Sequence, residues 1–239
     1  MLILALDSST SVSTAAVARA AEGVHQRAEA SARGREILAE VSASTRGASE
    51  ALLPAAHGSL TLAGVDLGEV EHILVGVGPG TFTGIRISLA ATRFLSLATG
   101  AALSKGSTLS ALAAPALLAA GGSEVLAVLD ARRRQVFAQR FMADGARKEI
   151  LCLRPEELSA KLPSESTSLV VGDGAVRYRE VLSSLGRIPD GSSPLHRVTA
   201  AGHVLSADLS PVPAAEVVPL YLRKPDAEVR RDLNPWSRA

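Results

Sequence analysis

The densest cluster of residues that could do chemistry is a glycine-rich stretch in the first half of the chain. It reads Gly76-Val77-Gly78-Pro79-Gly80-Thr81-Phe82-Thr83-Gly84-Ile85-Arg86. Glycine permits backbone conformations closed to other residues, and the stretch enters a predicted helix whose first amide groups are unpaired and carry positive potential. Such a helix start could hold a phosphate or another anion. The P-loop lysine and the dinucleotide-binding spacing are absent, so spacing alone favours a tight strand-to-helix turn capped by Thr81 or Thr83.

Two polar turns are the other candidates for phosphate or metal chemistry. Asp7-Ser8-Ser9-Thr10 follows a short apolar run that predicts a strand, and Asp130-Ala131-Arg132-Arg133-Arg134-Gln135 joins two more predicted strands. The second turn has no glycine that would let backbone amides close around a phosphate. Its three consecutive arginines could attract an anion, although such a run is more often a solvated turn or a partner contact.

The histidines, the cysteine and the serines show no pattern of a metal site or a nucleophile. The histidines are His25, His57, His72, His196 and His203, and no two have the spacing of helical metal ligands. We interpret each as a surface or capping residue. Cys152, the only cysteine, lies in an apolar run, which predicts an inert thiol and a reducing compartment. No serine lies in a G-x-S-x-G elbow, so a peptidase finds no support.

The elements that must position these residues alternate between strands and helices. We expect strands at 2–6, 12–18, 73–77, 125–129, 136–142 and 169–172, with 24–30 as a further candidate, and helices at 49–62, 82–99, 108–120, 155–162, 175–185 and 199–207. The stretch that follows residue 30 could be loop or helix, and 217–223 is expected to be extended. Because each half contains a strand–turn–strand element, the pattern predicts an α/β protein of two similar subdomains.

Composition narrows the function classes. The chain has 239 residues, of which 47% are hydrophobic and 21% charged, as is typical of a globular protein. A net charge of +1 gives no general attraction to phosphate backbones, and 3% aromatic residues offer few stacking platforms for nucleic acid. The first residues carry no positive segment, and their apolar run is too short for a bilayer. We therefore expect a soluble, cytoplasmic protein without a membrane partner.

The glycine-rich stretch resembles the G-x-G-P-G-[ST]-F-T-G-x-R signature of the TsaB family. Further matches follow in the family's order: ILALDSST near the start, SEALLP at 49–54, VLAVLDARRRQVFAQRF at 125–141 and PLYLR at 219–223. The resemblance covers residues 1–223 and implies the two-lobed fold of actin, heat-shock-70 proteins and sugar kinases, a ribonuclease H-like α/β fold with mixed sheets. It implies an N-terminal lobe at 1–106 with a returning helix at about 195–222, a second lobe at 107–194 and a flexible tail at 224–239.

The same resemblance implies a supporting role instead of catalysis by this chain alone. In the family, TsaB binds TsaD, which transfers a threonylcarbamoyl group to N6 of adenosine 37 in tRNA, and the ATPase TsaE docks on the pair. A heterodimer with TsaD, a homodimer in its absence and only indirect contact with tRNA are therefore expected. No cofactor or metal of the chain's own is expected, and Ala48, where many relatives have histidine, weakens a catalytic role further.

The resemblance also assigns the glycine stretch and the helix after it to structure and partner contact. The expected loop and interface residues are Gly78, Pro79, Gly80, Thr81, Phe82, Thr83, Gly84, Arg86, Ala90, Ala91, Arg93 and Phe94. The helix is apolar nearly all round, so we expect burial on more than one side, either under this chain's own helices or under a partner. Arg86 and Arg93 are expected at the rim of that interface.

In nucleotide-using proteins of the fold that the resemblance implies, two hairpin turns hold the phosphates and an aspartate near the first turn positions the metal. Here these two turns are expected to survive only as remnants. Their residues are Asp7, Ser8, Ser9, Thr10 and Asp130. The alternative function is a stand-alone ATP-dependent enzyme of the same fold, similar to a small-molecule kinase, in which nucleotide binding would depend on Asp7 and magnesium.

Overall fold

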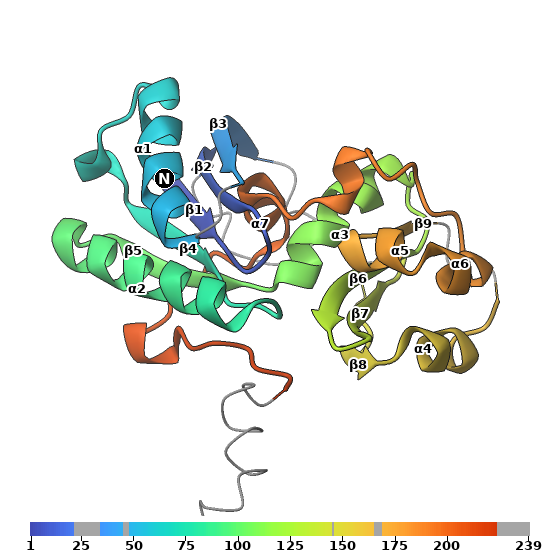
Figure 1. Cartoon of the computed structure of the whole chain (residues 1–239). Helices are drawn as coiled ribbons and strands as arrows, with labels where there is room; N and C mark the ends of the chain where they lie inside the picture. Colours follow the sequence, from blue (N-terminus) through green and yellow to red (C-terminus); the bar gives the residue numbers. More distant parts are fainter. Residues whose placement is uncertain (22–33, 45–47, 145, 165–168, 224–239) are drawn as a thin grey trace, which may run out of the picture.

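The computed structural model of the chain describes residues 1–21, 34–44, 48–144, 146–164 and 169–223. Two sheets lie side by side, each with helices against its faces (Figure 1). The predicted α/β class is confirmed. The candidate strand at 24–30 and the tail at 224–239 lie outside the described residues, and the lobe boundaries near 106 and 194 stay predictions.

The first sheet has five strands in the order β3-β2-β1-β4-β5. The strands are β1 Leu2–Asp7, β2 Ser13–Ala20, β3 Arg35–Ala43, β4 His72–Gly76 and β5 Ala102–Gly106. β1 pairs antiparallel with β2 and parallel with β4, which pairs parallel with β5. The carboxyl ends of β1, β4 and β5 therefore share one edge, where Asp7 and the glycine-rich stretch meet.

Helices cover both faces of this sheet. α1 Ala48–Ala63 and α2 Phe82–Thr99 pack on one face, where Leu4, Leu52 and Ile85 belong to one buried cluster. α7 Ala200–Ser206 packs on the other face, where Ala200 and Val204 join Ile3 and Ala5. The alternation of buried residues along β1 places side chains in both clusters, as a strand buried on both faces requires.

The second sheet has four strands in the order β8-β7-β6-β9. They are β6 Val125–Arg132, β7 Gln135–Phe141, β8 Leu151–Leu153 and β9 Leu169–Val171. One face packs against α3 Thr108–Ala119, and the other against α4 Pro155–Lys161, α5 Asp173–Arg177 and α6 Arg179–Leu182. Short 3-10 helices complete the described elements at Leu67–Glu69, Ser183–Leu185, Pro194–His196 and Ala214–Glu216.

α3 and α7 cross between the two sheets (Figure 1). The crossing is close because Gly202 has no side chain: a Cβ there would lie 2.2 Å from the carbonyl oxygen of Ala111. Thr199 caps α7 by accepting a hydrogen bond from the Gly202 amide at 2.9 Å. This crossing places α7 where its side chains reach the end of β1.

Several predicted elements need correction. Residues 35–43 form β3, where the sequence suggested loop or helix, and the short strands β5 and β8 were not predicted. The helix expected at 175–185 is broken at Tyr178, whose φ of −112° and ψ of 34° lie outside the helical range. In contrast, α2 has the predicted bounds and ends at Gly100 in a left-handed conformation.

Among the described residues, none of the helices has the length and apolar character needed to span a membrane.

Candidate functional site

The glycine-rich stretch lies directly against the first polar turn. The Thr81 amide donates to the carbonyl oxygen of Ser9 at 2.7 Å. A Cβ at Gly80 would lie 2.2 Å from that oxygen, and one at Gly84 would lie 1.8 Å from the carbonyl oxygen of Ser8. These glycines therefore serve a close backbone approach. Thr81 is the N-cap of α2 but makes no side-chain capping bond, so the turn is tight without the predicted threonine cap.

The polar groups of the first turn are bonded within the chain. The Ser8 amide donates to the Ser88 hydroxyl at 2.9 Å, and the Ser8 hydroxyl donates to the Gly84 carbonyl at 3.0 Å. The amide and the hydroxyl of Ser9 both donate to Asp7 Oδ1, at 2.6 and 2.8 Å. Asp7, Ser8 and Ser9 are buried. The amides of Ser8 and Ser9, which a phosphate clamp would use, therefore already have partners.

The carboxylate of Asp7 also has a partner that the sequence did not predict. Its Oδ2 lies 2.7 Å from Nε2 of His203 on α7, and both side chains are fully buried. Gly76 and Gly106 make the space for this pair. A Cβ at Gly76 would lie 1.8 Å from Asp7 Oδ2, and one at Gly106 would lie 2.6 Å from His203 Nδ1. The glycines that end β4 and β5 were the only sequence signal for it.

The interpretation of every histidine as a surface or capping residue is wrong for His203 and for two others. His72 is buried on β4, and its Nε2 lies 2.8 Å from the Ser104 hydroxyl. His196 is buried and accepts a hydrogen bond from the Gly172 amide at 3.1 Å. His57 is exposed, as expected, and His25 lies outside the described residues. Periodicity could not reveal these histidines because their partners come from other elements.

In the second turn, Asp130 is bonded both within the turn and to α5. Asp130 accepts from the Arg132 amide at 2.9 Å and forms an ion pair with Arg177 at 3.0 Å. The Asp130 amide donates to Asp173 Oδ1 at 2.9 Å. A pocket of about 480 Å³ adjoins this turn, lined by Ser11, Asp130, Arg132, Asp173, Val176, Arg177, Gly191, Ser193, His196 and Arg197. Of the five expected remnant residues only Asp130 lines it; Thr10 instead receives a hydrogen bond from the Val12 amide at 3.3 Å.

Asp173, an acidic residue that lines this pocket, is expected to make the stability of the chain depend on pH. Burial raises the pKa of the Asp173 carboxyl, and the nearby Asp130 carboxylate raises it further, against the opposing effect of backbone hydrogen bonds. The native chain thus holds this proton to higher pH than the unfolded chain does. Its contribution to stability is present at low pH and is lost as pH rises from the ordinary aspartate pKa through the raised native one.

We therefore expect Asp173→Asn, which keeps the Oδ1 acceptor, to raise the melting temperature at pH 7 and to leave it unchanged near about pH 3. Calorimetric melting of both proteins across that range measures the difference. A variant that melts below the natural chain at pH 7 would contradict the expected sign.

Helix α2 buries one side only, so the expected burial on more than one side is not met within the chain. Ile85, Leu89 and Leu95 are buried, whereas Phe94 is 68% and Leu97 86% exposed. Ala90 is exposed and Ala91 is half-buried. On the adjoining α1, Leu53 and Leu62 are 49% and 72% exposed. Leu53 and Leu62 are nine residues apart on α1 and therefore point to opposite sides of that helix. Phe94 and Leu97 are three residues apart and share one side of α2 with Ala90, and we call Phe94 and Leu97 the apolar face of α2.

The two arginines of α2 contact the carboxy-terminal segment of the same chain. Arg86 lies over the Phe82 ring at 3.7 Å and donates to the Tyr221 hydroxyl at 3.0 Å. Arg93 donates to the carbonyl oxygen of Val217 at 2.9 Å. Gly78 and Pro79 are buried under the same segment, where the Leu220 amide donates to the Val77 carbonyl, while Thr83 is exposed. A role of these arginines at an interface rim stays a prediction.

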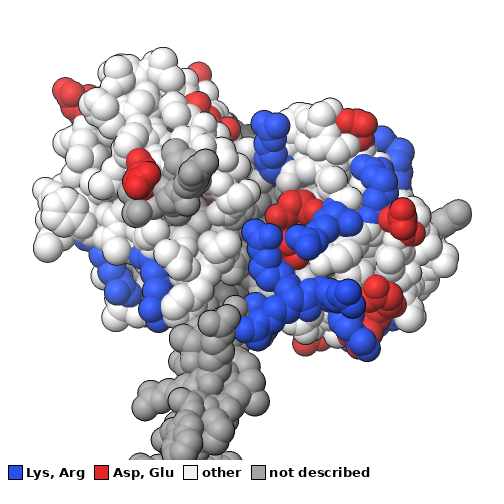
Figure 2. Space-filling view, viewed as in Figure 1, with Lys and Arg blue, Asp and Glu red and all other residues white. Residues whose placement is uncertain are grey.

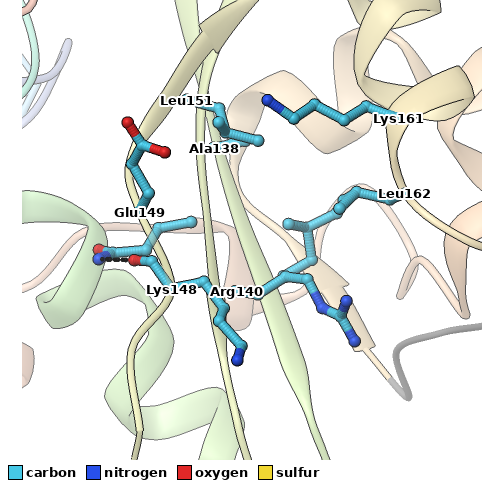
Figure 3. A pocket seen from close by; sticks show the side chains of 9 residues that line it. Ala138, Arg140, Lys148, Glu149, Leu151, Lys161 and Leu162 are labelled. Carbon is cyan, nitrogen blue, oxygen red and sulfur yellow. Dashed lines mark hydrogen bonds between the residues drawn. The ribbon is translucent and has the colours of Figure 1, made fainter.

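A second pocket, of about 300 Å³, lies at the edge of the second sheet (Figure 3). Ala138, Leu151 and Leu162 give it an apolar floor, and Arg140 and Lys161 stand at its sides. None of the predicted site residues lines it. Within the described residues, no group of three or more His, Cys, Asp or Glu side chains is arranged to hold a metal ion.

The chain is similar in sequence to known proteins. The family model described as "TsaD: tRNA N6-adenosine threonylcarbamoyltransferase" matches residues 36–152. An uncharacterized protein of Mycobacterium tuberculosis is 29% identical over 227 residues, which cover 95% of this chain and 93% of that protein. The tRNA threonylcarbamoyladenosine biosynthesis protein TsaB of Escherichia coli is 32% identical over 130 residues, covering 52% of this chain and 56% of its own length.

A second TsaB relative and a solved structure are also similar over nearly the whole chain. TsaB of Haemophilus influenzae is 24% identical over 237 residues, covering 93% of this chain and 94% of that protein. The structure of YeaZ from Pseudomonas aeruginosa superposes with a TM-score of 0.71 at 27% identity and covers 92% of this chain and 99% of that chain. The expected mixed α/β fold with two sheets is confirmed, and it is the fold of YeaZ. These comparisons support the TsaB/YeaZ family for this chain.

Proposed function

We propose that this chain is a non-catalytic scaffold subunit for the synthesis of N6-threonylcarbamoyladenosine at position 37 of tRNA. It binds a TsaD-type transferase and helps a TsaE-type ATPase to dock, and it acts in the cytoplasm. The names of its TsaB relatives, which are tRNA threonylcarbamoyladenosine biosynthesis proteins, and the TsaD family model that matches the chain support the pathway. The role within that pathway rests on the exposed apolar face of α2 and on the internally bonded first turn.

The observation that carries the proposal is the apolar face of α2, formed by Phe94 and Leu97. Phe94 and Leu97 would together remove a large apolar area from water on binding, and burial of such area is the main favourable term in association. Exposed Ala90 lies on the same helix and permits close approach of a partner helix. Contiguous exposed apolar side chains on a folded protein are typical of a protein-interaction surface.

The closed first turn supports a role without catalysis by this chain alone. Asp7 is bonded to His203 and Ser9, and the amides of Ser8 and Ser9 have partners in the chain. Nucleotide-binding by this turn would require breaking several buried hydrogen bonds, each of which costs free energy to leave unmade. We therefore propose that ATP and metal enter the reaction through the partner subunits.

The same apolar face would pair two copies of the chain when the transferase is absent. An isologous contact uses one patch on both subunits, so a single surface can serve the homodimer and the heterodimer in turn. Binding of the transferase would then compete with self-association.

Leu97→Glu tests the proposal, because it places a charge on the apolar face at a position that contributes little to the core. We expect the affinity for the same organism's TsaD-type protein to fall by about 30-fold or more, as at a central interface residue, while the melting temperature stays unchanged. Size-exclusion chromatography with light scattering on mixtures of the two purified proteins measures the complex.

Leu118→Glu is the matched control. Leu118 is 63% exposed on α3, outside the apolar face, so the same substitution there should leave the complex intact. Equal complex formation by natural chain, Leu97→Glu and Leu118→Glu would refute this interface, and no complex with the natural chain would refute the scaffold role.

A further inference from the structure

The tip of the β6–β7 hairpin is made of three exposed arginines that the proposed function does not use. Arg132 ends β6, and Arg133 and Arg134 form the turn before Gln135. All three are exposed. Figure 2 shows that Lys and Arg side chains gather on the half of the molecule that contains the second sheet, around a small acidic area. The other half of this face carries few of them.

The backbone of this turn is unusual for its residue type. Arg132, Arg133 and Arg134 have φ angles of 62°, 51° and 57°, and within the described residues they are the non-glycine positions with positive φ. A two-residue hairpin turn with positive φ strongly favours Asn-Gly, because other side chains are strained there. Arginine at these positions therefore lowers the stability of the folded chain relative to asparagine or glycine. Strain of this kind tends to persist where the side chains have a function.

Two further arginines stand near the hairpin tip. Arg177 and Arg197 line the pocket next to the second turn together with Arg132. We call Arg132, Arg133, Arg134, Arg177 and Arg197 the arginine patch. The two acidic residues of the pocket offset part of this charge, because Asp130 is paired with Arg132 and Arg177 and Asp173 is exposed beside them. The patch has five arginines against these two carboxylates. The charge that faces solvent is therefore predominantly positive.

We propose that the arginine patch binds the phosphate backbone of an RNA. Guanidinium groups present fixed forks of donors that match phosphate oxygens, and arginines from separate elements can engage successive phosphates. Such contacts position a nucleic acid without reading its sequence, so they do not need aromatic stacking platforms. Because the proposed pathway modifies tRNA, this inference rests on the proposed function and replaces the expected indirect tRNA contact by a direct one.

The chemistry of the patch favours RNA over the other polyanionic partners. A protein interface usually has an apolar centre, but Val176 is the one large apolar residue that lines the pocket. Among the described residues, the exposed large apolar side chains lie elsewhere, on α1, α2, α3 and the segment at 218–221. A free nucleotide needs a closed clamp, and Asp7, Ser8 and Ser9 of the first turn are bonded internally. An open, convex turn with several arginines suits a long phosphate backbone.

The test replaces the turn by the residues its geometry prefers, Arg133→Asn with Arg134→Gly. Because Asn-Gly fits positive φ at both positions, the melting temperature should not fall, so a loss of binding cannot be ascribed to unfolding. Affinity for an unmodified tRNA transcript is measured at several salt concentrations, for the free chain and for its complex with the TsaD-type protein. We expect binding to weaken by about tenfold or more and the salt slope to fall by about 1 to 2.

The matched control removes two positive charges elsewhere, with Arg19→Gln on β2 and Lys161→Gln at the end of α4. It should leave the affinity and the salt slope close to those of the natural chain. If it weakens binding as much as the Asn-Gly variant does, the effect is general electrostatics and the proposed patch is wrong.

The remaining outcomes separate this inference from the proposed function. An Asn-Gly variant that forms the complex and binds tRNA with unchanged affinity overturns the RNA patch and leaves the scaffold role intact. A variant that no longer binds the TsaD-type protein makes the patch a protein interface and also overturns the inference. If the natural chain forms no complex, the scaffold role fails, but tRNA binding by the free chain that the substitution abolishes would still support the patch.

Discussion

Gly84→Ala is expected to lower the free energy of unfolding by about 3 kcal/mol or more. The new Cβ would lie 1.8 Å from the carbonyl oxygen of Ser8 and 2.6 Å from Oγ1 of Thr81. The backbone carbonyl of Ser8 cannot rotate away from the new Cβ as a flexible side chain could, so α2 and the first turn must move apart. That movement would also break the Ser8 hydrogen bonds to Gly84 and Ser88. Denaturant unfolding followed by circular dichroism measures the loss.

The sign of this effect distinguishes tertiary packing from local helix preference. Gly84 lies within α2, where alanine is the better helix former by about 1 kcal/mol, so local propensity alone predicts stabilisation. Gly58 on α1 is the matched control, because its added Cβ would meet Val41 at an ordinary 3.5 Å. Gly58→Ala should be neutral or stabilising by up to about 1 kcal/mol. A Gly84→Ala protein as stable as Gly58→Ala would show that the loop and the first turn are not in close contact.

His203→Leu should destabilise the chain by about 3 to 5 kcal/mol, because it leaves the buried carboxylate of Asp7 without its partner on α7. His203→Gln can still donate a hydrogen bond, so its free energy of unfolding should fall much less than that of His203→Leu. Asp7→Asn combined with each substitution completes a double-mutant cycle, and we expect the loss from His203→Leu to shrink when the carboxylate is already gone.

The same variants test the alternative of a stand-alone ATP-dependent enzyme. If Asp7 served nucleotide and magnesium, Asp7→Asn would abolish ATP binding while leaving stability nearly unchanged. We expect the reverse: an effect on stability, and no heat of ATP binding by the natural chain in calorimetry with magnesium present. A measurable ATP affinity that depends on Asp7 would favour the enzyme and contradict the closed turn.

Local sequence signals were sufficient for the parts of this protein whose structure depends on neighbours along the chain. The helix bounds at Phe82 and Thr99 followed from a strand-to-helix turn and from Gly100 as a left-handed cap. The α/β class followed from the alternation of apolar runs and helical segments. The glycine-rich signature identified the family because its glycines meet strict steric limits at fixed spacing.

The tertiary structure decided everything that depends on pairing between distant residues. β5 is a short strand whose paired residues on β4 lie 30 positions earlier, as His72 and Ala102 do, so no local period marks it. His203 meets Asp7 across 196 positions, and only the crossing of α3 and α7 brings the two together. The sequence could not show which side of α2 is exposed, for the same reason. When a helix is apolar nearly all round, its buried side can be assigned only once the position of the sheet is known.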